Sequence, residues 1–225
     1  MTRPWAPRSL LASLGDETCE RLLSLGVGRE FPAGRRLISE GDESNHVEII
    51  TRGFVKIVIS TNGLETLLAI RAPGDVVGES AGLTGQPRMA TVRTCGPVTA
   101  VAVRHGDFKH FLTGHADVAI RLASMMGNRL RYANQRRADF ATSSPETRLA
   151  RVLVDLAHSC GRNTGAGVVF DIALTQQELA SMVGVGEATV QRALRELRDR
   201  GLVGTGYRRV RLPDLAGLQA AAEKA

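Results

Sequence analysis

Two short patterns near residue 80 could carry chemistry. The first is Gly-Glu-Ser-Ala-Gly at residues 78–82, which has the G-x-S-x-G spacing of a serine-hydrolase nucleophile turn. Such a turn needs a strand before the serine and a helix after it, in a sheet where strands and helices alternate. Gly82, Gly85 and Pro87 follow Ser80 within seven residues, so we expect no helix there. The surrounding sequence also lacks alternating strands and helices, and we predict that the chain is not an enzyme.

The second pattern is formed by the same glycines and Arg88, and it indicates phosphate chemistry. A phosphodiester monoanion is bound by a guanidinium group and by backbone amides that converge from a turn. Arg88 supplies the guanidinium, and the small residues Gly78, Gly82 and Ala90 leave room for the anion. Glu79 repels a phosphate, but its carboxylate can accept a hydrogen bond from a ribose hydroxyl and pair with an arginine.

Residues 28–105, which must position this pattern, read as a small β-domain. Short β-branched runs alternate with glycine-containing breaks, at roughly the 8–12-residue intervals typical of a barrel or sandwich. The runs are 47–50, 54–60, 66–70, 90–94 and 98–103. Before them, residues 16–25 predict a short helix with acidic residues in its first turn.

Residues 116–142 form one long helical pattern without proline. One stripe has heptad spacing and small side chains, and consists of Ile120, Ala123, Gly127, Leu130 and Asn134. A second stripe, which we expect to face the β-domain, consists of Leu122, Met126, Ala133 and Phe140. A helix with two apolar stripes needs two packing partners, which favours a dimerisation helix over an ordinary core helix.

A third segment begins after Ser143. Ser144 as N-cap and Pro145 at the first helical position predict a new helix, and 161–167 reads as a loop. Thr175 and Glu178 then form a capping box that starts a further helix.

The next residues predict a helical pair followed by a hairpin. Gly184 permits a tight turn, Gly186 can cap the second helix, and 201–212 reads as a β-hairpin wing with Arg208. The order of these elements predicts a winged helix-turn-helix.

This segment resembles the DNA-binding domain of the cyclic-AMP receptor protein and fumarate–nitrate regulator superfamily of bacterial transcription factors. The family pattern, T-x-x-E-[LI]-[AG]-x-x-[LIV]-G followed by x-[ST]-R-E-T-V-x-R, is here TQQELASMVG followed by VGEATVQR. The family's Ser/Thr cap is Gly186, and its Arg-Glu pair is Glu187-Ala188, so we expect a different operator from the family's best-known one. Arg192 matches the family's last base-reading arginine, which suits guanine. The resemblance implies DNA contacts from Thr175, Gln176, Glu187, Ala188, Thr189, Gln191, Arg192 and Arg208.

The pattern G-E-x-A-x-x-x-G-x-P-R-x-A-T-V resembles the phosphate-binding cassette of cyclic-nucleotide-binding domains, in the form found in regulatory subunits of cyclic-AMP-dependent kinase. The resemblance implies that Glu79 holds the ribose 2′-hydroxyl and Arg88 the cyclic phosphate of cyclic AMP. Asn134 on the long helix would contact adenine, or alternatively only set the register of a dimer. Met89 replaces a Ser or Thr that several bacterial relatives use. The implied effector contacts are Gly78, Glu79, Ser80, Arg88, Met89, Ala90 and Asn134.

Composition and the family resemblance complete the expected organisation. The formal charge of +6 permits nucleic acid binding without requiring it. Three scattered cysteines and five histidines show no metal-binding spacing, so we expect no metal, no iron–sulfur cluster and no haem. The absence of a signal peptide or an apolar span predicts a cytoplasmic protein.

The predicted fold class is α+β, in three parts. These are a β-roll effector domain at 1–115, a dimerisation and coupling helix at 116–142, and a winged helix-turn-helix domain at 143–225. The expected function is a transcription regulator controlled by cyclic AMP, which acts as a homodimer on a pseudo-palindromic DNA site and contacts RNA polymerase. Two alternatives remain: a family member with another effector or none, and a cyclic-nucleotide-binding scaffold that does not bind DNA. A domain that has lost its ligand, with Glu79 and Arg88 as a structural ion pair, also remains open.

Overall fold

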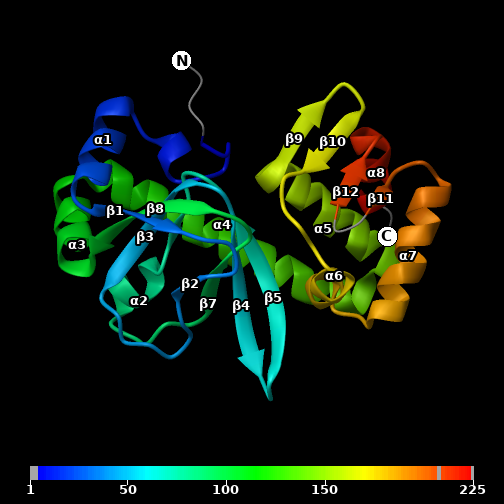
Figure 1. The fold of residues 1–225 in the computed structure, drawn as a ribbon, viewed down its shortest axis with the longest axis horizontal. Coiled ribbons are helices and arrows are strands. Elements are labelled where there is room, and N and C mark those ends of the chain that lie inside the picture. The colour runs from blue at the N-terminus through cyan, green and yellow to red at the C-terminus, as the bar shows by residue number, and fades with distance from the viewer. Residues whose placement is uncertain (1–4, 207–208, 224–225) are drawn as a thin grey trace. The chain divides into compact units, whose positions relative to one another are not determined.

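The computed structural model describes residues 5–206 and 209–223, and the chain forms two compact units. The first unit contains Met1–Glu65 and Ala69–Arg129, and the second contains Thr66–Leu68 and Leu130–Ala225. The division falls inside helix α4 (Ala116–Thr142), drawn in green in Figure 1. One continuous helix therefore belongs to both units.

The described part of the first unit is built on two four-stranded sheets. One has the strand order β1-β8-β3-β6, with β1 (Val27–Phe31), β3 (His46–Arg52), β6 (Val76–Val77) and β8 (Val98–Arg104). The other has the order β2-β7-β4-β5, with β2 (Arg36–Ile38), β4 (Val55–Thr61), β5 (Leu64–Arg71) and β7 (Thr91–Thr94). Strands β1 and β3 both pair antiparallel to β8, and β4 pairs antiparallel to β7. The β-domain predicted from the short runs is confirmed.

Strands β4 and β5 form the long hairpin visible in cyan in Figure 1. Its turn consists of Asn62 and Gly63, whose φ angles are 53° and 78°. Positive φ at both central residues is the pattern of a type I′ turn, which matches the twist of the flanking strands.

Helices accompany the sheets in the described part of this unit. They are η1 (Leu11–Ser13), α1 (Asp16–Ser24), α2 (Glu79–Thr84), α3 (His105–Gly114) and the first part of α4. Leu22 of α1, Phe108 of α3 and Leu122 of α4 pack in one buried cluster with Val47 and Ile49 of β3. The helix predicted at 16–25 is confirmed as α1.

The second unit carries the helical pair and its wing. After the end of α4 come α5 (Pro145–Cys160), β9 (Gly161–Thr164), β10 (Gly167–Phe170), α6 (Gln176–Val183), α7 (Glu187–Asp199), β11 (Gly204–Gly206), β12 (Arg209–Leu212) and α8 (Leu215–Glu223). The described strands form one sheet in the order β11-β12-β10-β9. Ser144 caps α5 as predicted, since its side chain accepts a hydrogen bond from the Thr147 amide at 3.1 Å.

Two local expectations were wrong. Ser80 is followed by helix α2 despite the nearby glycines, because this helix is only six residues long and ends at Thr84, before Pro87. Residues 161–167 are not a loop, since β9 and β10 pair in antiparallel register from Gly161 opposite Phe170 to Thr164 opposite Gly167. Arg162 further links the start of β9 to Asp171 through an ion pair of 3.1 Å.

The two stripes of α4 differ in burial. In the first stripe, Ile120 and Leu130 are 66% and 63% exposed, so the seam is free in the single chain. In the second stripe, Leu122 is buried in the first unit, as expected. The expectation was wrong for Phe140, which lies in the second unit and packs against Gly184 between α6 and α7.

Candidate phosphate-binding site and nucleic-acid interface

Gly78 places the start of α2 beside Arg88. It is the N-cap of α2 and has a φ of 81°, a left-handed conformation that favours glycine. A Cβ atom at this position would lie 2.5 Å from Nη1 of Arg88 and 2.8 Å from the Ile38 side chain. Glycine is therefore required both by the backbone and by the close approach of the guanidinium.

Arg88 is 3% exposed, and its guanidinium is held by acceptors from three segments. Its Nε donates to Ser44 Oγ at 3.0 Å, its Nη1 donates to the Gly78 carbonyl at 2.8 Å, and its Nη2 donates to the His46 carbonyl. A guanidinium has five N–H groups in a planar fork, so these three bonds orient the group and leave donors for an anion.

The charge on Arg88 is opposed by burial and supported by nearby carboxylates. Desolvation lowers the pKa of Arg88, while the charges of Asp42, Glu48 and Glu79 act in the opposite direction. An arginine remains protonated at neutral pH in proteins. The site therefore presents a buried, oriented cation.

Glu79 follows directly in the chain, and its partner is Arg129 of α4. The two side chains meet at 2.6 Å between Nη1 of Arg129 and Oε1 of Glu79, and Glu79 is 8% exposed. Nη2 of Arg129 also donates to Asp75 Oδ1 and to the Val76 carbonyl, both at 3.1 Å. Arg129 thus orients the carboxylate that the sequence assigned to a ribose hydroxyl.

Arg129 contacts the candidate site and was not predicted from the sequence, although a signal existed. It lies seven residues after the buried Leu122 and four after the buried Met125, on the face of α4 that packs into the first unit. An arginine on a buried helical face needs an anionic partner. Glu79, which the sequence predicts can pair with an arginine, is the carboxylate that meets Arg129.

The other predicted effector residues divide into two groups. Ser80, Met89 and Ala90 are neighbours in sequence of Glu79 and Arg88. Ser80 lies in the first turn of α2, Ala90 is buried, and Met89 is 71% exposed. Asn134 belongs to the second unit and is exposed, and its contact with adenine stays a prediction.

His105 backs helix α2 on the side of Gly82. A Cβ atom on Gly82 would lie 2.6 Å from Cδ2 of His105, so the imidazole fills the space that a larger residue would need. Burial lowers the pKa of His105, the charge of Arg88 lowers it further, and a hydrogen bond with the His46 backbone opposes the shift. The imidazole is therefore biased toward its neutral form.

The helical pair in the second unit has the predicted caps. Thr175 and Glu178 form a reciprocal capping box, with bonds of 2.8 and 3.1 Å, at the start of α6. Gly184 follows α6 with a φ of 73°, and Gly186 is the N-cap of α7 without a side-chain bond. The interpretation of these residues as a helix-turn-helix is confirmed.

Helix α7 buries one face and exposes the other. Val190, Leu194 and Leu197 are buried, whereas Arg192 and Arg195 are exposed. The other candidate DNA-binding residues of this pair, Thr175, Gln176, Glu187, Ala188 and Gln191, are exposed, and Thr189 is half-buried.

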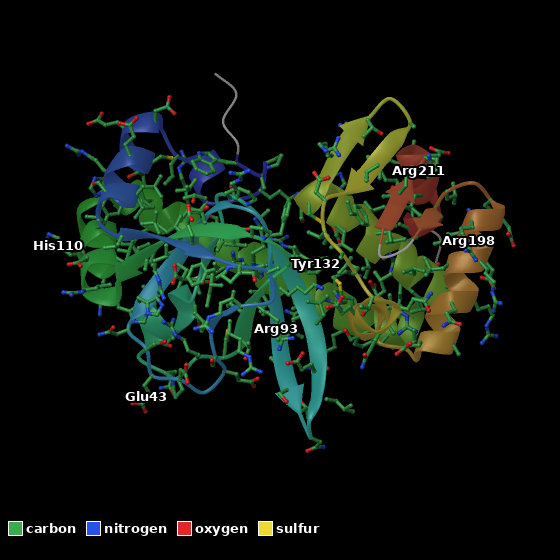
Figure 2. The ribbon with its side chains drawn as sticks, viewed as in Figure 1. Glu43, Arg93, His110, Tyr132, Arg198 and Arg211 are labelled. Atoms are coloured by element: carbon green, nitrogen blue, oxygen red, sulfur yellow. The ribbon has the colours of Figure 1, made fainter. Side chains whose placement is uncertain are left out.

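Two of these polar side chains contact each other. Gln191 of α7 donates through Nε2 to Oε1 of Gln176 at 2.6 Å, which links the exposed starts of the two helices. The wing is present as β11 and β12, with Arg211 exposed on β12, while Arg208 lies outside the described residues. Figure 2 shows Arg198 on α7 and Arg211 on β12.

Two kinds of candidate are absent from the described residues. Among residues 5–206 and 209–223, no three His, Cys, Asp or Glu side chains are grouped so that they could hold a metal ion. In the same part of the chain, no helix is long and apolar enough to cross a membrane.

Comparison with known protein families assigns both halves of the chain. Residues 28–115 match the cyclic nucleotide-binding domain, and residues 147–221 match the Crp-like helix-turn-helix domain. The chain is 30% identical over 175 residues to the CRP-like cAMP-activated global transcriptional regulator of Mycobacterium tuberculosis, which covers 77% of this chain and 78% of that protein.

Solved structures show the same fold. The structure of FixK2 from Bradyrhizobium japonicum is similar, with a TM-score of 0.75 at 19% identity, and covers 89% of this chain and 98% of that one. The c-di-GMP responsive global regulator CLP of Xanthomonas campestris gives a TM-score of 0.73 at 21% identity, and covers 88% of this chain and 99% of that one.

Proposed function

Since the chain belongs to the cyclic-AMP receptor protein and fumarate–nitrate regulator superfamily of transcription regulators, we propose that cyclic AMP bound in its β-roll controls its affinity for DNA. The observation that carries the proposal is the oriented pair of Arg88 and Glu79. A buried guanidinium with donors to spare suits a cyclic phosphate, and a carboxylate fixed by Arg129 suits a ribose 2′-hydroxyl.

The proposed contacts follow from where these groups lie. Arg88 neutralises the single charge of the cyclic phosphate, and the small residues Gly78 and Ala90 let the backbone approach it. Backbone amides near Ser80 and Met89 would supply further donors. The ion pair of Glu79 with Arg129 supports the ligand role, because among the described residues Arg88 forms no direct ion pair with Glu79.

A second candidate effector is a different nucleotide. Met89 offers no hydroxyl to the phosphate and exposes 71% of its side chain, so the rim of the site is more apolar than a Ser or Thr would make it. The c-di-GMP responsive regulator CLP of Xanthomonas campestris has the same fold. Cyclic GMP and cyclic di-GMP are therefore the alternatives to compare with cyclic AMP.

Calorimetry of the full chain against these three nucleotides tests the proposal. We expect cyclic AMP to bind, and Arg88→Ala to weaken it by about tenfold to a hundredfold, since a hydrogen bond to a charged group is worth roughly 1.5–3 kcal/mol. Arg93→Ala is the matched control, because Arg93 lies on β7 and pairs with Glu65 instead.

Each outcome of this experiment is informative. Arg88→Lys keeps the charge but removes the planar fork of donors. Its affinity for cyclic AMP should therefore lie between that of the wild type and that of Arg88→Ala. If roughly millimolar cyclic AMP gives no heat and another nucleotide binds in a way that depends on Arg88, that nucleotide is the effector of this site. If none of the three nucleotides binds, the proposal of a nucleotide effector is wrong, and the protein is a transcription regulator of another kind.

The remaining parts of the proposal concern assembly and partners. We propose a cytoplasmic homodimer joined along the exposed seam of α4, with Asn134 contributing to the base contact, and a pseudo-palindromic DNA site read by α7. Arg192 would read one base, the capping residues Thr175 and Gln176 would contact phosphates, and RNA polymerase would be a further partner. The exposed apolar side chains of Ile120 and Leu130 support the dimer, because a soluble helix does not normally leave such a row in water.

A further inference from the structure

The second unit contains a cavity that the proposed function does not use. It has a volume of about 270 Å³ and lies among the end of α4, helix α5, the last turn of α6 and the end of α8. All of the residues that line it belong to the second unit. For comparison, an apolar cavity of ~150 Å³ holds benzene, so this cavity has room for a substituted ring.

The walls of the cavity are apolar and aromatic. Phe140 of α4, Val152 of α5, and Met182 and Val183 of α6 contribute hydrocarbon or thioether surface. Tyr132, labelled in Figure 2, adds a second ring from α4. Such a lining favours a ligand with an apolar body over an inorganic ion.

The polar groups in the cavity carry an excess of positive charge. Three arginines, Arg136, Arg148 and Arg151, line it together with two carboxylates, Asp139 and Asp155, which gives a formal charge of 3 − 2 = +1. A single positive charge next to an apolar wall suits a monoanion.

These arginines differ in how their donors are used. Arg151 is engaged: it donates to Asp139 at 2.7 Å, to Ser143 at 2.8 Å and to the Ala222 carbonyl at 2.7 Å. Asp139 is itself 4% exposed and also accepts from Gln135 at 2.9 Å, so its charge is already satisfied. Arg151 and Asp139 therefore form a structural pair in the wall.

The Arg148 side chain differs from those of Arg136 and Arg151, because it donates no hydrogen bond among the described residues. Its guanidinium carbon lies 5.4 Å from the centre of the Phe140 ring, within the range of a cation–π contact. Its buried Nε has no hydrogen-bond partner among the described residues, and no carboxylate there forms an ion pair with it. A buried donor without a partner destabilises the fold, and a bound acceptor would remove that penalty.

We propose that this cavity binds a small aromatic carboxylate, with the carboxylate on Arg148 and the ring against Phe140 and Met182. The planar fork of a guanidinium matches the two oxygens of a carboxylate, and the apolar walls match a ring.

Occupancy of the cavity would act on the DNA-binding helices through two of its walls. Met182 lies in the last turn of α6, and its carbonyl accepts a hydrogen bond from Arg136. Phe140 packs against Gly184 in the turn between α6 and α7, since a Cβ atom there would lie 2.4 Å from the ring. A carboxylate that binds this arrangement preferentially must change DNA affinity by the factor that DNA changes the affinity for the carboxylate.

Calorimetry and ligand-detected NMR on the full chain test the site, with benzoate and phenylacetate as probes and benzamide as the neutral control. We expect one or both acids to bind with a dissociation constant of about 1 mM or tighter, and benzamide to bind at least about tenfold more weakly. Arg148→Gln should weaken the acids by about tenfold or more, whereas Arg137→Gln, an exposed arginine of α4 outside the cavity, should leave binding unchanged.

A second variant and a second ligand keep the result unambiguous. If Arg148→Gln does not fold, Arg148→Lys, which keeps the charge and loses the fork, should still weaken the acids. Arg88→Ala should not affect benzoate, and Arg148→Gln should not affect cyclic AMP, so a failure of one site is distinguishable from a failure of the other. No binding of either acid at about 10 mM, or equal binding to the wild type and Arg148→Gln, overturns the proposal.

Discussion

At the scale of single residues, the candidate effector site is organised by partners that lie far away in the chain. Arg88 depends on Ser44 and Gly78, and Glu79 depends on Arg129, fifty residues later. The local pattern of residues 78–92 predicts which side chains take part, because their types and spacing are visible in one stretch. It does not predict Arg129, because that contact is created by the packing of α4 on the first unit.

His105 should make the stability of the first unit depend on pH. Its pKa in the folded chain lies below the ordinary histidine value of about 6.5, first because of burial and second because of the Arg88 charge. Below about pH 6.5 the unfolded chain binds a proton that the folded chain resists, so stability falls as the pH falls. The fall ends once the pH is below the folded pKa, where both states are protonated.

Thermal unfolding between about pH 7.5 and 5 measures this effect. We expect the midpoint of the wild type to fall over this range more steeply than that of His105→Gln. His110→Gln is the matched control, because His110 lies exposed on the same helix α3 (Figure 2). Parallel curves for the wild type and His105→Gln would mean that other groups cause the pH dependence.

At the scale of secondary-structure elements, caps and turns were predictable where a single residue type is strongly preferred. Ser144, Thr175 with Glu178, and Gly184 are local signals with a direct physical reason, and each lies where it was expected. The short helix α2 was missed because glycine and proline nearby argue against helices, yet one and a half turns fit before Pro87. Strand β9 was missed because Gly161 and Asn163 have low strand propensity, which pairing with β10 overrides.

Gly184 provides a prediction about the turn between α6 and α7. Gly184→Ala should reduce the free energy of unfolding by more than roughly 1 kcal/mol, because φ is positive there and the new Cβ meets the Phe140 ring. Urea unfolding measures the loss, and Gly165→Ala, with no atom within 4 Å of the added Cβ, is the control.

A double variant separates the two causes. If the contact with Phe140 contributes, Gly184→Ala should cost less in a Phe140→Ala background than in the wild type. An equal cost in both backgrounds would assign the whole effect to the backbone conformation.

Helix α7 provides a prediction about base reading. Arg192→Ala should cost roughly 1–3 kcal/mol of DNA affinity and relax specificity at one base position, because an arginine can pair with both acceptors of a guanine. Arg195→Ala removes the same charge from the same exposed face and serves as the comparison. Titrations of an operator library in constant salt measure both; an equal loss on specific and random DNA for Arg192→Ala would mean that it contacts only phosphates.

At the scale of the whole molecule, the seam of α4 predicts the oligomeric state. Sedimentation velocity should give a species of twice 24.1 kDa for the wild type. Leu130→Asp should shift the protein toward the monomer, because a charge placed on a buried seam is costly, whereas Arg131→Asp, an exposed neighbour off the seam, should not. A wild-type monomer at micromolar concentration, or a dimer that tolerates Leu130→Asp, would locate the dimer contact elsewhere.

The order of the parts was visible in the sequence, whereas the division of the chain was not. The long helix spans 116–142 as expected, yet the chain is divided into its compact units between Arg129 and Leu130, in the middle of this helix. Sequence signals mark where a helix begins and ends, but the unit to which each turn belongs is decided by its packing partners. The cavity around Arg148 was also beyond sequence reasoning, because it is formed by helices that are adjacent only in the folded unit.

The anchoring of Arg88 has a consequence for the speed of the response. The loop before β3 is tied to Arg88 by backbone bonds as well as by Ser44, since Gly41 donates to the Arg88 carbonyl at 2.8 Å and Arg88 donates to that of Asp42 at 2.9 Å. In the proposed function, an arriving cyclic phosphate would meet a guanidinium already held in one orientation, so little ordering would slow its capture. Nucleotides that share this phosphate should therefore arrive at similar rates and differ mainly in residence time. The lifetime of the bound state would then be set by the contacts to the sugar and base, and not by the guanidinium that first attracts the ligand.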